Sequence, residues 1–165
     1  MKPASLLCFL LLAVPAYARI GETTQQIEAR YGKSIETTRP KCPATVAELY
    51  DKNGFRIMVG FYEGKSYYEE FQKIDPEKPN SYLEITETER SWLLKANEKF
   101  RFSPLGSTMV TAQDGTQHEE WRYVSLDRQA EAIYGLKVFA IRSLRVEKQK
   151  EADEKKREAD KLKDF

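Results

Sequence analysis

Residues 51–74 read DKNGFRIMVGFYEGKSYYEEFQKI, which is two strand patterns bounded by tight turns. Asn53-Gly54 supplies two residues that tolerate positive φ, as a two-residue hairpin turn requires, and Glu63-Gly64 marks a second turn. Between the turns the apolar side chains alternate, so one face of the strand is apolar. Together with a first strand at residues 45–50, this stretch predicts a three-stranded antiparallel meander.

Two helices are predicted from capping boxes, in which a Thr caps the helix and a Gln or Glu three residues later reaches back to the cap. The first helix follows a cap at Thr23 and ends at Gly32, and the second follows a cap at Thr86. In the second helix Trp92 and Ala96 lie four residues apart, so both are expected to face the core.

The second half of the chain shows the same order of elements as the first. Strand patterns at 107–112 and 117–126 flank a turn at Asp114-Gly115, and residues 130–142 are predicted as one long strand. The sequence therefore predicts a two-layer α+β domain, an antiparallel meander of about six strands with both short helices on one face. A tandem αβββ duplication and mere coincidence both remain open as the origin of the likeness.

An export signal is predicted at residues 1–18. Lys2 precedes a short apolar run, and Ala16-Tyr17-Ala18 is a small-x-small cleavage site. The run is shorter than the roughly 20 residues of a membrane span. We therefore expect an exported chain, periplasmic or secreted, with no transmembrane segment after cleavage. Without Lys2 the chain has 27 − 1 = 26 basic and 26 acidic residues, a balance that argues against nucleic-acid binding.

Beyond the signal, the composition predicts two regions. Residues 19–143 form a single α+β domain, with 19–81 and 82–143 as its possible halves. Residues 144–165 mix acidic and basic side chains without glycine or proline, which predicts a charged helical tail. A coiled-coil partner is the less favoured alternative for this tail, because sustained apolar heptads are missing.

Convergent catalytic chemistry is hard to find in this sequence. His118 is the only histidine, and on a strand only Glu120 among its neighbouring acids would share its face. Cys42 is the only cysteine after the signal, so it is either free or paired with another chain. We therefore expect no catalytic residues, no metal and no cofactor.

Aromatic side chains give the best functional hint, and the candidate interface residues are Tyr62, Tyr67, Tyr68, Phe71 and Trp121. Strand alternation cannot bury all of them on one face. Exposed tyrosines flanked by charge are typical of protein interfaces. The alternative is that a second layer or the tail covers them.

The segment 21–33 reads GETTQQIEARYGK and carries a family resemblance. It is similar to the start of many uncharacterised exported bacterial proteins. It also resembles the Gly-Met-Thr…Gly-x-Pro start of the SmpA/OmlA (BamE-like) outer-membrane assembly proteins, and that of the related β-lactamase-inhibitor-like fold. The chain departs from that family at Ser34, where the family has proline, and in lacking a lipid-bearing cysteine at the mature start. The resemblance implies a non-catalytic envelope protein that binds another protein.

The preferred hypothesis is an exported, non-enzymatic protein that binds a protein or peptide through the aromatic face or the edge of its sheet. Self-association into a homo-oligomer is compatible with it. The alternative is a carbohydrate-binding module or small hydrolase that uses Trp and Tyr rings as sugar platforms.

Overall fold

The computed structural model describes residues 20–38, 46–78 and 80–163. The predicted signal and Cys42 lie outside these residues. The elements are, in chain order, α1 (Thr24–Tyr31), β1 (Glu36–Thr38), β2 (Val46–Lys52), β3 (Phe55–Tyr62), β4 (Lys65–Ile74), β5 (Tyr82–Leu83), α2 (Glu87–Ala96), a 3₁₀ turn η1 (Glu98–Phe100), β6 (Phe102–Thr111), β7 (Gln117–Ser125), β8 (Ala130–Gly135), β9 (Val138–Ser143) and α3 (Leu144–Lys163).

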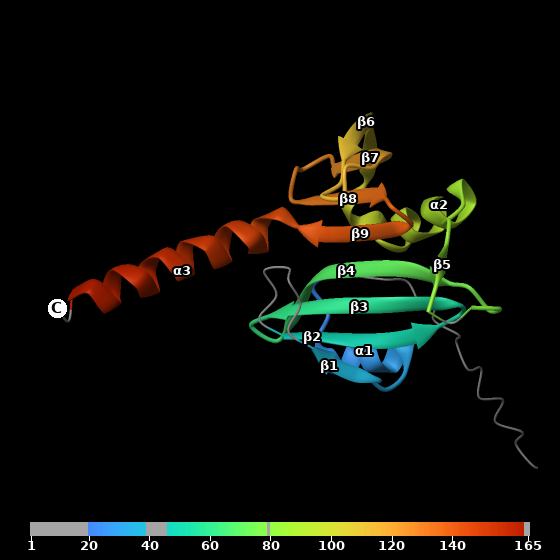
Figure 1. Ribbon diagram of the computed structural model, residues 1–165. Helices are drawn as coiled ribbons and strands as arrows, with labels where there is room; N and C mark the ends of the chain where they lie inside the picture. Colours follow the sequence, from blue (N-terminus) through green and yellow to red (C-terminus); the bar gives the residue numbers. More distant parts are fainter. Residues whose placement is uncertain (1–19, 39–45, 79, 164–165) are drawn as a thin grey trace, which may run out of the picture.

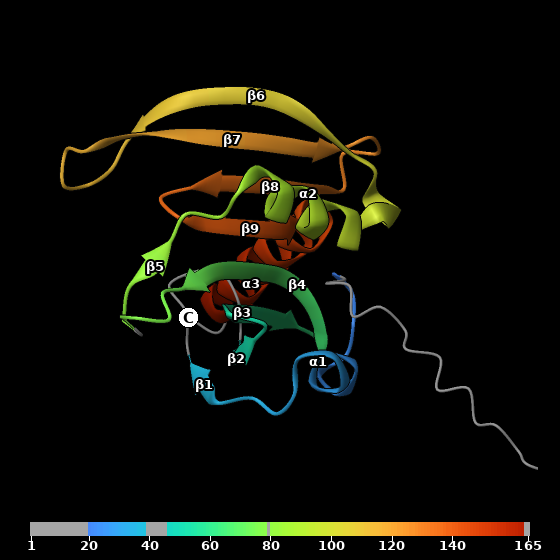
Figure 2. The same cartoon turned by 90° about the vertical axis from the view of Figure 1, so that its right-hand side faces the viewer.

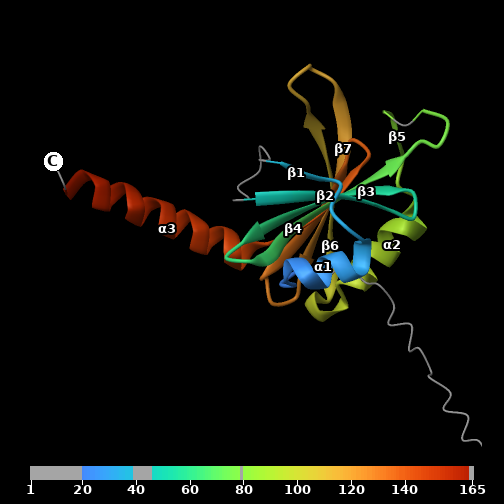
Figure 3. The same cartoon turned by 90° about the horizontal axis from the view of Figure 1, so that it is seen from below.

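All nine strands join one antiparallel sheet in the order β1-β2-β3-β4-β9-β8-β7-β6, with β5 paired to β4 (Figure 1). Its centre is the β4·β9 pair, where Phe71 lies opposite Phe139 and Glu69 lies opposite Ile141. Figure 3 shows that the strand directions rotate strongly between β1 and β6, the twist expected of a long antiparallel sheet. The sheet is therefore continuous across both halves of the chain.

The core lies on one side of this sheet. Tyr50, Ile57, Phe71, Phe139 and Tyr134 face it from consecutive strands, as their pairing shows. The helices add Ile27 and Tyr31 from α1 and Leu93 and Leu94 from α2. These residues bury the alternating apolar positions that the sequence places on the strands.

Both capping boxes are confirmed. The Thr23 backbone N–H donates to the Gln26 side chain at 2.9 Å, and the Thr86 N–H donates to Glu89 at 2.8 Å. In each box the Thr hydroxyl accepts the backbone N–H of the third residue. Gly32 ends α1 with φ +96°, a conformation that favours glycine.

The predicted fold class is wrong. Over the described residues the protein is mostly β, with nine strands in one sheet instead of about six, and it is not a two-layer α+β fold with helices covering one face. The reason is the size of the helices relative to the sheet. α1 has 8 residues and α2 has 10, whereas the charged helix α3 extends away from the sheet (Figure 1). Trp92 of α2, predicted to be core, is 66% exposed.

The single long strand predicted at 130–142 is also wrong. Leu136 and Lys137 form a two-residue turn, so the segment folds back on itself as β8 and β9. β1 and β5 were not predicted, because strands of three and two residues depend on pairing with β2 and β4 rather than on their own sequence.

α3 begins directly after β9 and carries the charged tail sequence. It contacts the sheet near β3, where the Tyr62 hydroxyl donates to Asp153 at 2.5 Å. Among the helices that the structure describes, none has both the length and the apolar character needed to cross a bilayer.

Candidate functional site

The outer strand β6 presents an exposed, uncharged sheet edge, which is the first candidate site. Figure 2 shows it at the rim of the sheet, in a long hairpin with β7. Among the described residues its ladder partner is β7 alone. Most of its side chains are exposed, including Leu105 at 67% and Met109 at 65%. An extended apolar strand is therefore presented to solvent.

The hairpin turn fixes which way the backbone of β6 points. The Ala112 N–H donates to the Thr116 carbonyl at 2.8 Å, so these two residues are a hydrogen-bonded pair. Hydrogen-bonded and non-hydrogen-bonded pairs alternate along an antiparallel ladder. Ser107, Met109 and Thr111 therefore direct their N–H and C=O groups away from β7, toward the open side of the strand.

β6 also lacks the charged side chains that usually protect a sheet edge, although its first part has Pro104 and a bulge. Proteins commonly place charged side chains on an edge strand, because unpaired backbone groups attract other strands. The chain has 27 basic and 26 acidic residues in 165, yet residues 102–113 carry no charge. A bulge between Pro104 and Gly106 interrupts only the first part of β6, which leaves Gly106–Thr111 regular.

A second feature is a cleft of about 570 Å³ beside the β8–β9 turn. Trp121 of β7 and Tyr134 of β8 line it, and the Arg90 guanidinium of α2 stacks on the Tyr134 ring at 4.3 Å from the centroid. The Tyr134 hydroxyl donates to Glu84, and Arg90 Nη1 donates to the Ile85 carbonyl at 3.2 Å. These contacts hold two aromatic rings and a cation around one depression.

The cleft is lined by two residues with a strained backbone, Leu136 and Lys137, and by a buried tyrosine, Tyr134. Leu136 and Lys137, which line it, have φ of 48° and 65°, a left-handed conformation that costs non-glycine residues energy. Leu136 is nevertheless 56% exposed, so the fold does not use its side chain as core. Burial, with the Glu84 carboxylate beside it, raises the pKa of the Tyr134 hydroxyl, which therefore stays protonated and donates to Glu84.

The predicted interface residues do not share one exposed surface. Tyr62, Tyr67 and Phe71 are buried, and Tyr68 and Trp121 are half-buried. Tyr62 and Tyr67 meet edge to face at 6.5 Å between ring centroids, and Tyr68 donates to Glu70 at 2.6 Å on the other face of the sheet. Trp121 alone reaches one of the candidate sites, the cleft beside the β8–β9 turn.

Clustered metal ligands are absent from the part of the chain that the structure describes. His118 packs over Gly135, where an added Cβ would lie 3.3 Å from the imidazole Cδ2. Glu120 binds Arg122 at 2.7 Å instead of facing an ion with His118. The histidine is thus a packing residue of the β7 strand.

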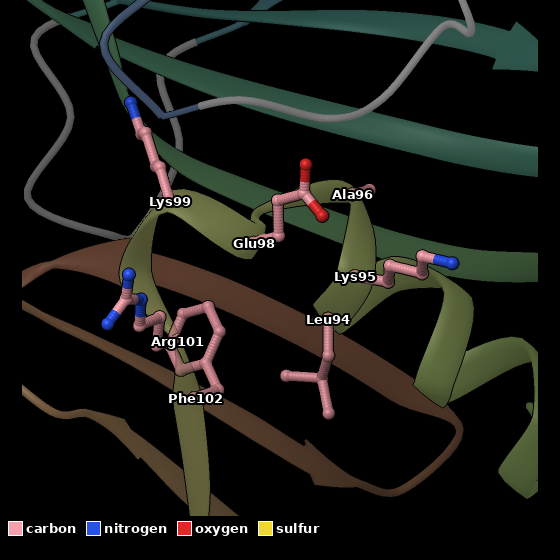
Figure 4. A pocket seen from close by; sticks show the side chains of 7 residues that line it. All are labelled: Leu94, Lys95, Ala96, Glu98, Lys99, Arg101 and Phe102. Atoms are coloured by element: carbon pink, nitrogen blue, oxygen red, sulfur yellow. The ribbon is translucent and has the colours of Figure 1, made fainter.

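A third depression, of about 770 Å³, lies between α2 and the start of β6 (Figure 4). Lys95, Lys99 and Arg101 line it, but Figure 4 shows their charged ends pointing in different directions. The Lys99 ammonium already donates to the Ile20 carbonyl. The cations therefore do not converge on a point where an anion would bind.

Comparison with known proteins gives no further guide to the site, since no family model, curated protein or solved structure matches this chain.

Sequence reasoning named Trp121 of the cleft and a sheet edge in general, but it identified neither β6 nor the other residues of the cleft. The uncharged run at residues 102–113 was a readable signal for the β6 edge, because it stands out in a chain that is 32% charged. The cleft had no comparable signal, because its residues come from α2, β7 and the β8–β9 turn, and the sequence does not mark that turn.

Proposed function

We propose that this protein is an exported, non-enzymatic binding module that takes an extended segment of another protein chain as an added strand on β6. The observation that carries the proposal is the uncharged edge with outward-facing backbone groups at Ser107, Met109 and Thr111. In strand addition, main-chain hydrogen bonds supply affinity and side chains at alternate positions supply specificity.

The predicted export signal and the resemblance of the segment 21–33 to envelope proteins support a location outside the cytoplasm. Among the described residues, no group of three or more His, Cys, Asp or Glu side chains could hold a metal ion. The exposed Leu105 and Met109 side chains would contribute apolar contact beside the new ladder.

Photo-cross-linking from the edge tests the proposal in cells that express the chain. Benzoylphenylalanine at Leu105 lies beside the edge and should capture a protein. Met109→Pro removes an outward N–H that β7 does not use, so the hairpin should persist while capture is lost. Met109→Leu keeps the N–H and should retain capture. Hydrogen exchange of the captured complex should show protection at Ser107, Met109 and Thr111.

The control site for the cross-linker is Leu126 in the β7–β8 turn, which is 69% exposed and so as accessible as Leu105. Equal adducts from Leu105 and Leu126 would show non-specific contact. Adducts from Leu105 that survive Met109→Pro would show that the captured protein binds without adding a strand. Either result would refute the proposal.

A second candidate function is carbohydrate binding, which the cleft beside the β8–β9 turn favours. Trp121, Tyr134, Arg90 and Glu84 all line this cleft, and aromatic rings beside charged side chains are the residue types that sugar sites use. A glycan array should then give a saturable signal that Trp121→Ala abolishes. Trp92→Ala is the matched control, because Trp92 is exposed outside the cleft. A flat array, or equal loss in both variants, would rule the candidate out.

A further inference from the structure

We infer that the strand added to β6 is β6 of a second copy of this chain, so that two sheets join across a two-fold axis at Met109. The inference rests on the proposed function, since it names the occupant of the same edge. It follows from three properties of β6: the direction of its backbone groups, the symmetry of its sequence around Met109, and its lack of charge.

The backbone groups select the register. In an antiparallel pair centred on Met109, the outward-facing residues Ser107, Met109 and Thr111 oppose Thr111, Met109 and Ser107 of the second copy. Each such pair exchanges two N–H···O bonds. This register uses all three outward-facing residues of the regular segment Gly106–Thr111, whereas centring the pair on Thr108 would leave Thr111 opposite the bulged Leu105.

The side chains suit the same register. Met109 and its copy lie directly opposite each other on one face, where both are now exposed. On the other face Thr108 lies opposite Val110 of the second copy, and β-branched residues pair well across strands. The new pairs are therefore apolar or uncharged throughout.

The lack of charge distinguishes a second copy from other partners. A two-fold axis through Met109 places that residue directly opposite its own copy, so a charged residue at this position would meet a like charge. β6 avoids this conflict in a chain that is 32% charged. The pairing also continues the antiparallel order of the existing sheet without a change of strand direction.

Light scattering during size-exclusion chromatography, at about 10 μM to 1 mM chain, tests the inference. The wild-type chain should reach twice the monomer mass. Met109→Lys places two ammonium groups at the axis and should weaken the dimer about tenfold or more. Leu105→Lys is the matched control, because Leu105 is equally exposed on the same strand but lies outside the paired segment.

Disulfide trapping tests the register separately. In a Cys8→Ser, Cys42→Ser background, Met109→Cys should form a dimer-linking disulfide on mild oxidation, because opposed residues have Cα atoms about 5.5 Å apart. Leu105→Cys should not form this disulfide. Equal trapping at the two positions would overturn the inference, as would a dimer that Met109→Lys leaves intact.

A wild-type chain that stays monomeric would also overturn the inference. The proposed function would survive that result if adducts with a different protein still depended on the Met109 N–H. The inference and the proposed function would both fail only if, in addition, the cross-linked adducts still formed in Met109→Pro.

Discussion

The turn between β8 and β9 offers the sharpest test of how the backbone stores strain. Leu136 and Lys137 adopt φ of 48° and 65°, and the Asn53-Gly54 turn between β2 and β3 adopts 51° and 79°. The left-handed conformation costs an ordinary residue about 1–2 kcal/mol, whereas Asn and Gly tolerate it. Introducing a glycine also destabilises the folded state by about 0.5–1 kcal/mol, because glycine gives the unfolded chain more conformational entropy.

The double substitution Leu136→Asn, Lys137→Gly relieves about 2–4 kcal/mol of strain at two residues, so after the cost of the glycine it should stabilise the protein by about 1–3.5 kcal/mol. Little apolar burial is lost, because the Leu136 side chain is mostly exposed. Urea unfolding followed by circular dichroism should show a midpoint raised by about 0.5–1.75 M with an unchanged slope, taking a slope of about 2 kcal/mol/M. The converse exchange, Asn53→Leu with Gly54→Lys, should destabilise by a similar amount.

Single substitutions keep this test specific. Lys137→Ala removes the charge but keeps a Cβ in the left-handed region, so its free energy of unfolding should stay within about 0.5 kcal/mol of wild type. An unchanged or lower midpoint in the Asn-Gly variant would refute the strain argument. A gain in Lys137→Ala equal to that of the double variant would instead trace the effect to charge.

Two further predictions concern the packing of α2 and the sheet. Burial tends to raise the pKa of Glu89, but hydrogen bonds from Lys73 and Thr86 outweigh it and hold the pKa below its ordinary value of 4.5. The ionised carboxylate therefore stabilises the fold above pH 4.5, and this stabilisation is lost as pH falls through the lower pKa of the folded state. In Glu89→Gln the free energy of unfolding should therefore fall less steeply with decreasing pH below pH 4.5. The same steepness in variant and wild type would contradict this. Phe71→Ala should lower the free energy of unfolding, measured in urea, by about 3–5 kcal/mol, whereas Trp92→Ala should change it by no more than about 0.5 kcal/mol. Similar changes in the two variants would show that Phe71 is not buried and Trp92 not exposed as the structure has them.

Local chemistry made the helix ends and three of the turns predictable. Thr23 and Thr86 cap helices because the cap, its partner residue and the hydrogen bonds all lie within four positions. Asn53-Gly54 likewise turns where its own residues tolerate positive φ. In both cases the information needed is contained in a short window of sequence.

Features that depend on distant pairing were not predictable in the same way. Leu136 and Lys137 carry no turn signal, and the turn forms because β8 and β9 pair over six residues on either side. Trp92 has helical spacing suited to a core face, but the 10-residue α2 turns Leu93 and Leu94 toward the core instead. Tertiary packing overrides local preference at both places.

The two ends of the sheet show that solubility alone does not explain β6. At one end β1 is three residues long and includes Glu36, which are two of the devices that keep an edge from pairing. At the other end β6 is ten residues long and has no charged residue, although its neighbour β7 carries Glu119, Glu120 and Arg122. Among the described residues, one edge is thus protected and the other is unpaired over about six regular residues. The second strand proposed above would account for this difference, because it would cover the regular segment Gly106–Thr111 that Pro104 and the bulge leave unprotected.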